Sequence, residues 1–170
     1  MTNQSASQDS RELTLTSSDV CRIARVTLRQ LQWWDERQIV CPARTGRRRI
    51  YRSQDVIAIL VATELRRKGL SLQTIRKVLR VVQREMGRPQ GRTLVGQPDW
   101  YLVTDGKSAY FESDPEGIIE RLKDARQPML LVSISDQAAR LGEFEKKRAQ
   151  RATGSRRKGA RSADSQLRLF

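Results

Sequence analysis

Residues 27–52 read TLRQLQWWDERQIVCPARTGRRRIYR, and this stretch decides the fold. Its beginning carries large apolar residues three positions apart, which is typical of one face of a helix. Thr27 followed three residues later by Gln30 fits a capping box at the start of that helix. Gly46 then lies in a polar run that ends in apolar and aromatic residues, which predicts a hairpin turn. A short helix beside an arginine-rich hairpin suits the DNA major groove and its flanking phosphates.

The flanking segments predict further helices. One helix should begin near Asp19, where Thr16, Ser17 and Ser18 can cap free amides, and should stop at the tight connection of Arg25 and Val26. With the helix that follows it makes a helix-turn-helix. Ser53 and Ser71 each precede a run with apolar residues at helical spacing. The chain is expected to leave the second helix as an extended edge. Residues 13–86 should thus form a winged helix-turn-helix of four helices and a β-hairpin.

A different pattern follows the glycine- and proline-containing linker expected at residues 87–98. Residues 99–145 carry two short apolar runs around an Asp-Gly turn, a helix opened by Asp-Pro-Glu, and a third apolar run. Ser135 is expected to cap a further helix. This predicts a small ββαβ(α) domain, so that the fold class is mainly α with an α+β part.

Both ends of the chain are expected to be disordered. Residues 1–12 are polar, and residues 146–170 form a basic tail that ends in an apolar peptide. Within that tail, residues 146–161 contain eight positive side chains and no acid. The tail either adds salt-sensitive affinity for DNA, RNA or an anionic membrane, or only solubilises the protein.

The charge balance points to a polyanionic partner, because 33 Lys and Arg against 19 Asp and Glu give a net charge of +14. No apolar run approaches the ~20 residues that span a membrane, and the polar start does not resemble a secretory signal. Two cysteines without histidine argue against a metal site or an enzyme, and no cofactor is expected. Glu112, Asp114 and Glu116 form a possible carboxylate cluster, but Asp114 and Glu116 are better explained as helix-start residues. A cytoplasmic, nucleoid-associated protein is predicted.

Three short motifs in the N-terminal segment, taken together, form one recognisable pattern. Residues 31–35 read LQWWD and are followed by Gln38, Ile39 and a proline. The hairpin ends in Arg-Ile-Tyr at 49–51, and Asp55 then opens the next helix. Residues 69–72, Gly-Leu-Ser-Leu, join the third and fourth helices.

On these motifs, residues 15–82 resemble the DNA-binding domain of the MerR family of bacterial transcription regulators. The matching family runs are leucine-arginine-tyrosine-tyrosine-glutamate, then glycine-leucine and proline. Here Gln32 replaces the arginine, Trp33 and Trp34 replace the tyrosines, and Gln38 replaces the glycine. The resemblance implies a sequence-specific DNA-binding regulator whose second helix enters the major groove.

Thr27, Arg29, Gln30 and Trp33 are the candidate DNA-binding residues of that helix. Arginine can bind guanine and glutamine can bind adenine, although Gln30 is equally well explained by its own capping box. Trp33 either packs on the sugar-phosphate backbone or lies in the core, while Trp34 is expected in the core with Leu28 and Leu31.

The phosphate-binding set comes from the hairpin and from the joint between the third and fourth helices. Its hairpin members are Arg44, Arg47, Arg48 and Arg49, with Tyr51 bracing the hairpin on the third helix. Lys68 and Ser71 are expected to meet a phosphate at the start of the fourth helix, where free amides favour an anion.

A second hypothesis rests on the C-terminal peptide, with Gln166, Leu167, Leu169 and Phe170 as its docking residues. The peptide resembles the glutamine-leucine-x-leucine-phenylalanine motif with which bacterial replication and repair proteins dock on the sliding clamp. Chance and a protease tag are the alternatives for so short a motif. Double-stranded DNA is therefore the main expected partner, with the sliding clamp, RNA polymerase and a second copy of the chain as further candidates.

Overall fold

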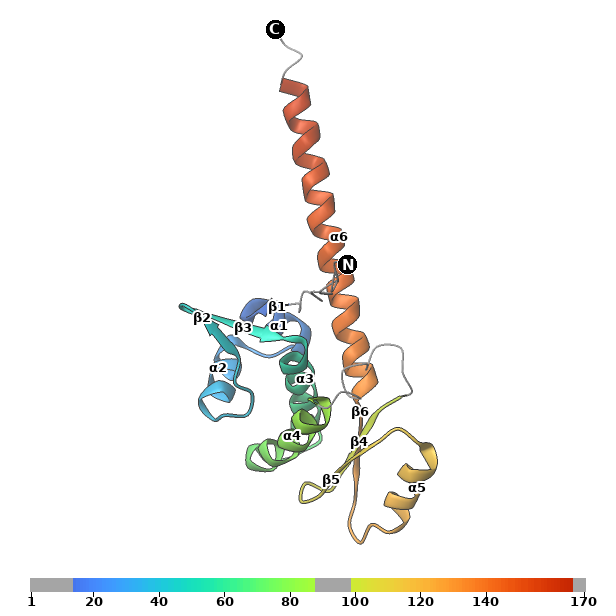
Figure 1. The fold of residues 1–170 in the computed structure, drawn as a ribbon. Helices are drawn as coiled ribbons and strands as arrows, with labels where there is room; N and C mark the ends of the chain where they lie inside the picture. Colours follow the sequence, from blue (N-terminus) through green and yellow to red (C-terminus); the bar gives the residue numbers. More distant parts are fainter. Residues whose placement is uncertain (1–13, 88–98, 167–170) are drawn as a thin grey trace, which may run out of the picture.

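The computed structural model describes residues 14–87 and 99–166, with side chains described as far as Arg151. Helices and one small sheet form the N-terminal half, and a second small sheet lies against it (Figure 1). The first half contains β1 (Thr14–Thr16), α1 (Ser17–Ala24), α2 (Leu28–Glu36), β2 (Ala43–Thr45), β3 (Arg48–Arg52), α3 (Ser53–Arg67) and α4 (Leu72–Met86). The second contains β4 (Tyr101–Thr104), β5 (Ala109–Glu112), α5 (Pro115–Lys123), β6 (Leu130–Ser133) and α6 (Ile134–Gln166).

The first two helices begin and end on local signals that the sequence carries. The Thr16 side chain caps α1 in a capping box with Asp19, and Thr27 does the same for α2. Helix α1 ends at Arg25, whose φ of 54° is left-handed. The helix-turn-helix therefore has the short connection that was predicted.

The end of α2 turns the chain into the core. Gln38 takes a left-handed φ of 54°, and the amide of Ile39 donates to the carbonyl of Trp34 at 2.9 Å. This tight end buries Ile39 and Val40. The extended edge predicted directly after α2 is thus wrong, because the strand begins only at Ala43.

The N-terminal sheet has the order β1-β3-β2, with antiparallel neighbours. Strands β2 and β3 form a hairpin around Gly46 and Arg47, and Gly46 has a φ of 60° that favours glycine. Strand β1 was not predicted, and its Leu15 lies opposite Tyr51 of β3.

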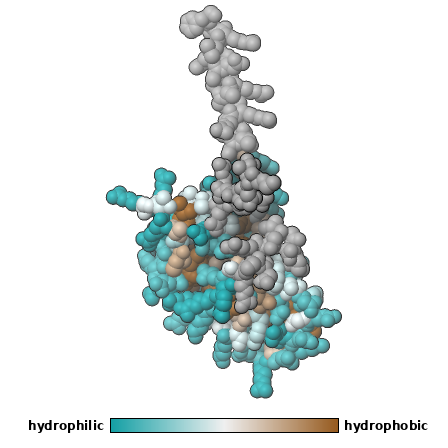
Figure 2. Space-filling model, in the orientation of Figure 1, coloured by the Kyte–Doolittle hydropathy of each residue, from teal (hydrophilic) through white to brown (hydrophobic). Residues whose placement is uncertain are grey.

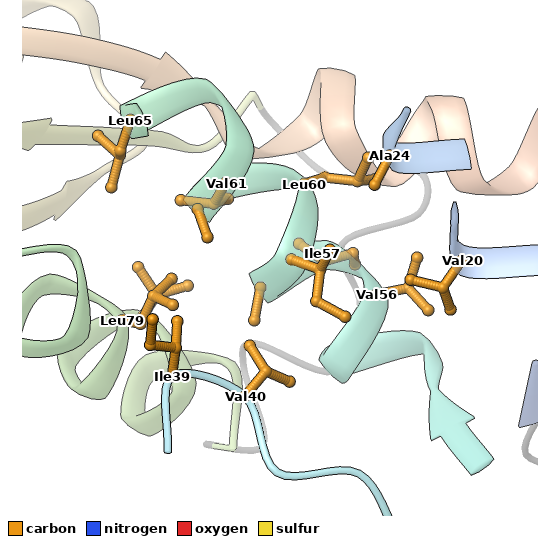
Figure 3. Close-up of a cluster of buried hydrophobic side chains, with 14 of the residues drawn as sticks. Val20, Ala24, Ile39, Val40, Val56, Ile57, Leu60, Val61, Leu65 and Leu79 are labelled. Atoms are coloured by element: carbon orange, nitrogen blue, oxygen red, sulfur yellow. The ribbon is translucent and has the colours of Figure 1, made fainter. Parts of the chain in front are cut away.

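Helix α3 is the centre of the core. Eight of its residues are buried, and they meet α1, the bend after α2, and α4 (Figure 3). In Figure 3, Ile57 and Val61 of α3 lie among side chains from α2's exit, α1 and α4, including Val40, Val20 and Leu79. This arrangement fixes the position of the helix-turn-helix.

The second sheet has the order β5-β4-β6 and joins the same core. Leu102 of β4 and Val132 of β6 are cross-strand partners within the hydrophobic cluster that α3 dominates. At the β4–β5 turn, Gly106 has a φ of 87°, and a Cβ there would lie 2.8 Å from Thr74 of α4. The linker expected at 87–98 lies almost wholly outside the described residues, and the division into two domains stays a prediction.

Helix α6 begins earlier than predicted. The Ser133 hydroxyl accepts from the amide of Asp136 at 3.0 Å and so caps the helix, whereas Ser135 accepts from the amide of Trp100 at 2.9 Å. Ser135 as the cap was wrong, because β6 passes into the helix without an intervening loop.

Helix α6 then continues to Gln166 and projects beyond the body of the protein (Figure 1). Arg140 donates to the carbonyl of Ile23 at 3.3 Å, and Arg148 lies 3.5 Å from Asp19, so α1 supports the helix. The disordered basic tail predicted from residue 146 onward is wrong as far as Gln166. A helix already docked extends readily through arginine, lysine, alanine and glutamine, which are strong helix formers.

Most of the described surface visible in Figure 2 is hydrophilic. Within the described ranges 14–87 and 99–166, no helix combines the length and the apolar character needed to cross a membrane. The predicted disorder of residues 1–12 and the apolar residues 167–170 lie outside the described part of the chain.

Candidate nucleic-acid interface

Helix α2 presents a polar face to solvent. Thr27, Arg29, Gln32 and Trp33 are all exposed, and they line a shallow hollow together with Gln30 and Glu36. The guanidinium carbon of Arg37 lies 5.6 Å from the centre of the Trp33 ring, which is a cation–π distance. The helix therefore offers a donor-rich surface around one flat aromatic side chain.

The two adjacent tryptophans have different environments. Trp33 is 39% exposed, whereas Trp34 is 5% exposed and lies in the core with Leu31. The core alternative for Trp33 is therefore wrong, and the core position of Trp34 is as predicted. Leu28, the first residue of α2, was also expected in the core but is 51% exposed.

Gln30 is already engaged at the start of the helix. Its Oε1 accepts from the Thr27 amide at 2.9 Å and from the Thr27 hydroxyl at 3.2 Å, and the Thr27 hydroxyl accepts from the Gln30 amide. A two-bond contact with adenine needs both the oxygen and the nitrogen of a glutamine amide. Such a contact would break the capping box, so the geometry favours the capping role of Gln30.

Asp35 connects α2 to the hairpin. Its Oδ2 accepts from Arg49 Nε at 2.7 Å and from Arg44 Nη2 at 3.1 Å. Arg44 and Arg49 are cross-strand partners in β2 and β3, so both side chains lie on the same face of the hairpin. The hydrogen bond to Asp35 is also the main cause that raises the pKa of Arg49. One carboxylate thus holds the hairpin at a fixed position beside α2.

Asp35 is a functional candidate that the sequence reasoning missed. Its sequence signal is the acid that ends the LQWWD run at residues 31–35, ahead of the arginine-rich hairpin. That reasoning assigned all four hairpin arginines to phosphates, whereas Arg49 is partly buried against Asp35.

The remaining hairpin arginines lie at the tip. Arg47 is the second residue of the turn and Arg48 begins β3, and both are exposed. Because Arg47 precedes β3, the alternation of side chains along a strand does not place it on the same face as Arg49. The structure therefore separates a tethered pair, Arg44 and Arg49, from two arginines at the tip.

Tyr51 is 1% exposed, so a direct contact between its side chain and DNA is excluded. Its side chain belongs to the hydrophobic core cluster, and Leu15 of β1 is its cross-strand partner. Burial is the main cause that raises the pKa of its hydroxyl, while Ser17 and Arg49 act in the opposite direction.

The joint between α3 and α4 uses its polar groups internally. Gly69 has a φ of 93° and ends α3, and Ser71 caps α4 by accepting from the Thr74 amide at 3.2 Å. Lys68 Nζ lies 3.9 Å from Glu64. Both Lys68 and Ser71 are exposed, and their contact with phosphate stays a prediction.

No three His, Cys, Asp or Glu side chains gather as a metal site among the residues described in the structure. The two cysteines are unlinked, and Cys41 is exposed while Cys21 is half-buried. Burial raises the pKa of the Cys21 thiol.

Comparison with known proteins agrees with this geometry. Residues 15–81 match the family model described as the MerR HTH family regulatory protein. This part of the chain is similar to the domain that the family model describes. The segment recognised by its motifs, residues 15–82, is thus confirmed nearly to the residue.

Three proteins described as uncharacterized HTH-type transcriptional regulators are distantly similar to this chain. One comes from Mycobacterium bovis and two come from strains of Mycobacterium tuberculosis. Each is 26% identical over 108 residues, which is 61% of this chain and 45% of the relative. The match therefore spans less than half the length of the curated relatives.

The matched family model and the names of the relatives describe regulatory proteins, not enzymes.

Proposed function

We propose that the protein is a sequence-specific DNA-binding transcription regulator in which α2 enters the major groove and the β2–β3 hairpin contacts the phosphates. One observation carries this proposal: Asp35 fastens two hairpin arginines to the helix whose outer face carries Arg29 and Trp33. The names of the relatives, which describe transcriptional regulators, support it.

Arg29 is the residue assigned to base recognition. It lies in the first turn of α2, and the N-terminal residues of a recognition helix are the ones that meet base edges. Its guanidinium can bind both acceptors of guanine. Trp33 follows one turn later and lies against the sugar-phosphate backbone, with Thr27 beside it at the helix start.

The hairpin arginines fix the position of the helix without choosing a sequence. Asp35 occupies Nε of Arg49, which leaves the Nη groups of the same guanidinium for a phosphate oxygen. Arg47 and Arg48 reach the backbone farther along the duplex, and Lys68 with Ser71 meets another phosphate. The basic second half of α6 adds affinity that is independent of sequence.

Arg29→Ala tests base recognition. The cognate site is first selected from random duplexes with the unaltered protein. We then expect the variant to lose about 1–3 kcal/mol on that site and far less on random DNA. Arg47→Ala serves as the matched control, because a phosphate contact should weaken both complexes equally and reduce the salt slope by about one.

An equal loss on cognate and random DNA for Arg29→Ala would remove the base-contact role. Selection that returns no preferred sequence would overturn the regulator proposal itself.

The clamp-docking alternative stays a prediction, since Leu167, Leu169 and Phe170 lie outside the described residues and Gln166 ends α6. Deletion of residues 166–170 should abolish binding to a purified sliding clamp if the alternative holds. RNA polymerase as a partner and a nucleoid-associated location in the cytoplasm follow only from the regulator proposal.

A further inference from the structure

A cleft of about 600 Å³ lies beside the helix-turn-helix, and residues of the α1–α2 turn, α2, α3 and α6 line it. Its volume falls within the range of about 300–1,000 Å³ that is usual for small-molecule sites. Three of the residues that line it, Ala24, Trp34 and Leu60, are buried members of the core cluster. One wall of the cleft is therefore apolar and is supported by the core.

The cleft lies on the flank of α2 that is turned away from the hairpin. Gln30 and Trp34 are the residues that α2 contributes to it. At 100° per residue, they lie about 140° and about 100° around the helix from Asp35, the residue that holds the hairpin. Neither Arg29 nor Trp33 lines the cleft. A molecule bound there would therefore touch α2 without covering its outer face.

Positive side chains from three separate elements surround this cleft. Arg25 comes from the α1–α2 turn, Arg66 and Arg67 come from the last turn of α3, and Arg140 comes from α6. Glu64 is the one acidic residue that lines the cleft within the described part of the chain, and it lies 3.4 Å from Arg67. Four guanidinium groups thus stand against one carboxylate, so the cleft attracts anions.

Three of the four arginines have no carboxylate partner among the residues that the structure describes. Arg66 donates to the carbonyl of Leu70 at 3.1 Å, and Arg140 donates to the carbonyl of Ile23 at 3.3 Å and to a side chain of its own helix. Arg25 forms no ion pair within the same described ranges. Since a guanidinium carries five N–H donors, several donors at the cleft remain available for a ligand.

The arrangement of these donors favours a phosphate group. A phosphate monoester offers three acceptor oxygens that point in different directions, and the guanidinium fork can bind two of them at once. The apolar wall formed by Trp34 and Leu60 suits the uncharged body of an organic molecule and not a bare ion.

We propose that this cleft binds a small organic phosphate, with the phosphate held by Arg25, Arg66 and Arg140 and the organic body against the apolar wall. The inference goes beyond DNA recognition and does not depend on it.

Calorimetric titration of the full-length protein tests the site, without DNA and in a phosphate-free buffer of low ionic strength. The main probe is adenosine 5′-diphosphate, and pyrophosphate and adenosine are titrated in parallel. We expect one molecule of adenosine 5′-diphosphate to bind per chain, with a Kd between about 10 μM and about 1 mM. Pyrophosphate should bind more weakly because it lacks the organic body, and adenosine should not bind because it lacks the phosphates.

Two substitutions assign the binding to the cleft. Arg25→Ala and Arg66→Ala should each weaken the binding of adenosine 5′-diphosphate by about tenfold, because each removes charge-assisted hydrogen bonds to the phosphate. Arg140 is left intact, since its bond to Ile23 supports α6. Arg80→Ala is the matched control: it makes the same charge change at an exposed position of α4 outside the cleft, and it should leave the binding within about twofold.

If neither adenosine 5′-diphosphate nor pyrophosphate binds up to about 10 mM, the proposal is overturned. An equal loss from Arg80→Ala and from the cleft variants would also overturn it, because binding would then follow the net charge of the protein and not the cleft.

The phosphate could instead belong to the DNA backbone, and a second measurement separates the two sources. In that case Arg66→Ala would lower the affinity for DNA and reduce the salt slope by about one, while adenosine 5′-diphosphate would not bind. That result would overturn the proposal. Loss of adenosine 5′-diphosphate binding by Arg66→Ala with unchanged affinity for DNA would support it, whatever the outcome for sequence-specific recognition.

Discussion

Helix α3 buries eight of its fifteen residues, whereas α5 buries none of its nine. Sequence pattern alone does not separate the two helices, because both carry apolar residues at helical spacing. The difference lies in what surrounds them: α3 meets α1, α4, α6 and both sheets, and α5 meets one strand along one side. Stability is therefore concentrated in α3, and surface available for another molecule is concentrated in α5.

The strongest test of this contrast is Leu60→Ala in α3. Leu60 is 1% exposed at the centre of the cluster, so its truncation should cost about 2–5 kcal/mol of the free energy of unfolding. Because one cluster joins both sheets, we expect a single transition in chemical denaturation, followed by fluorescence of the tryptophans. Two separate transitions would show that the sheets do not share a cooperative core.

The pH dependence of the free energy of unfolding tests whether Tyr51 of the hairpin is buried in that core. Burial raises the pKa of its hydroxyl in the folded state, so the folded protein holds the proton above the unfolded pKa of about 10. The unfolded state releases this proton first, and the free energy of unfolding should therefore fall as the pH rises above about 10, by up to about 1.4 kcal/mol per pH unit.

Tyr51→Phe should flatten this alkaline decline, whereas Tyr101→Phe should leave it in place. An identical decline in the Tyr51→Phe variant would contradict a raised pKa at this hydroxyl. Denaturation curves at pH 8 to 11 give the measurement.

The two residues with a left-handed backbone conformation, at the ends of α1 and α2, should have a smaller effect on the free energy of unfolding. Gln38 and Arg25 both have a φ of 54°, which costs a non-glycine residue about 1 kcal/mol. Arg25→Gly should stabilise the protein by about 0.5–1 kcal/mol, and Gln38→Gly by somewhat less, since it also loses the 3.0 Å hydrogen bond from Arg76.

Gln83→Gly in α4 is the matched control, because a glycine in an ordinary helical position should cost about 1 kcal/mol. If both Gln→Gly changes destabilise the protein equally, the backbone at Gln38 is not strained.

The smallest effect is expected from Ile119→Ala in α5. The side chain is half exposed in the single chain, so at low protein concentration the loss should stay below about 1 kcal/mol. A cost similar to that of Leu60→Ala, measured in dilute solution, would mean that α5 contributes to the core and would remove the contrast.

The sequence predicted those parts of the fold whose signals are local. The start of the first helix near Asp19, the capping box at Thr27 and the turn at Gly46 are found where the pattern places them, because each depends on residues close together in the chain. The family motif gave the helix-turn-helix for the same reason. The strand β1 was missed, since three residues with one apolar side chain carry little periodic signal.

The errors arise where distant contacts decide the structure. The docking of α6 on α1 extends a helix through residues whose charge alone suggested disorder. Tyr51 was counted among the DNA-binding residues, although its side chain is buried in a core cluster whose members are distant in the sequence. Asp35 was overlooked because its two partners are 9 and 14 residues away.

The length of α6 has a consequence for the size of the DNA footprint. From residue 146 to Gln166 the helix advances about 30 Å at 1.5 Å per residue. The same distance corresponds to about nine base pairs at 3.4 Å each, close to one turn of the duplex. A continuous helix carries this basic segment away from the body of the protein in a single direction. Protection of the DNA backbone should therefore reach asymmetrically to one side of the recognised bases.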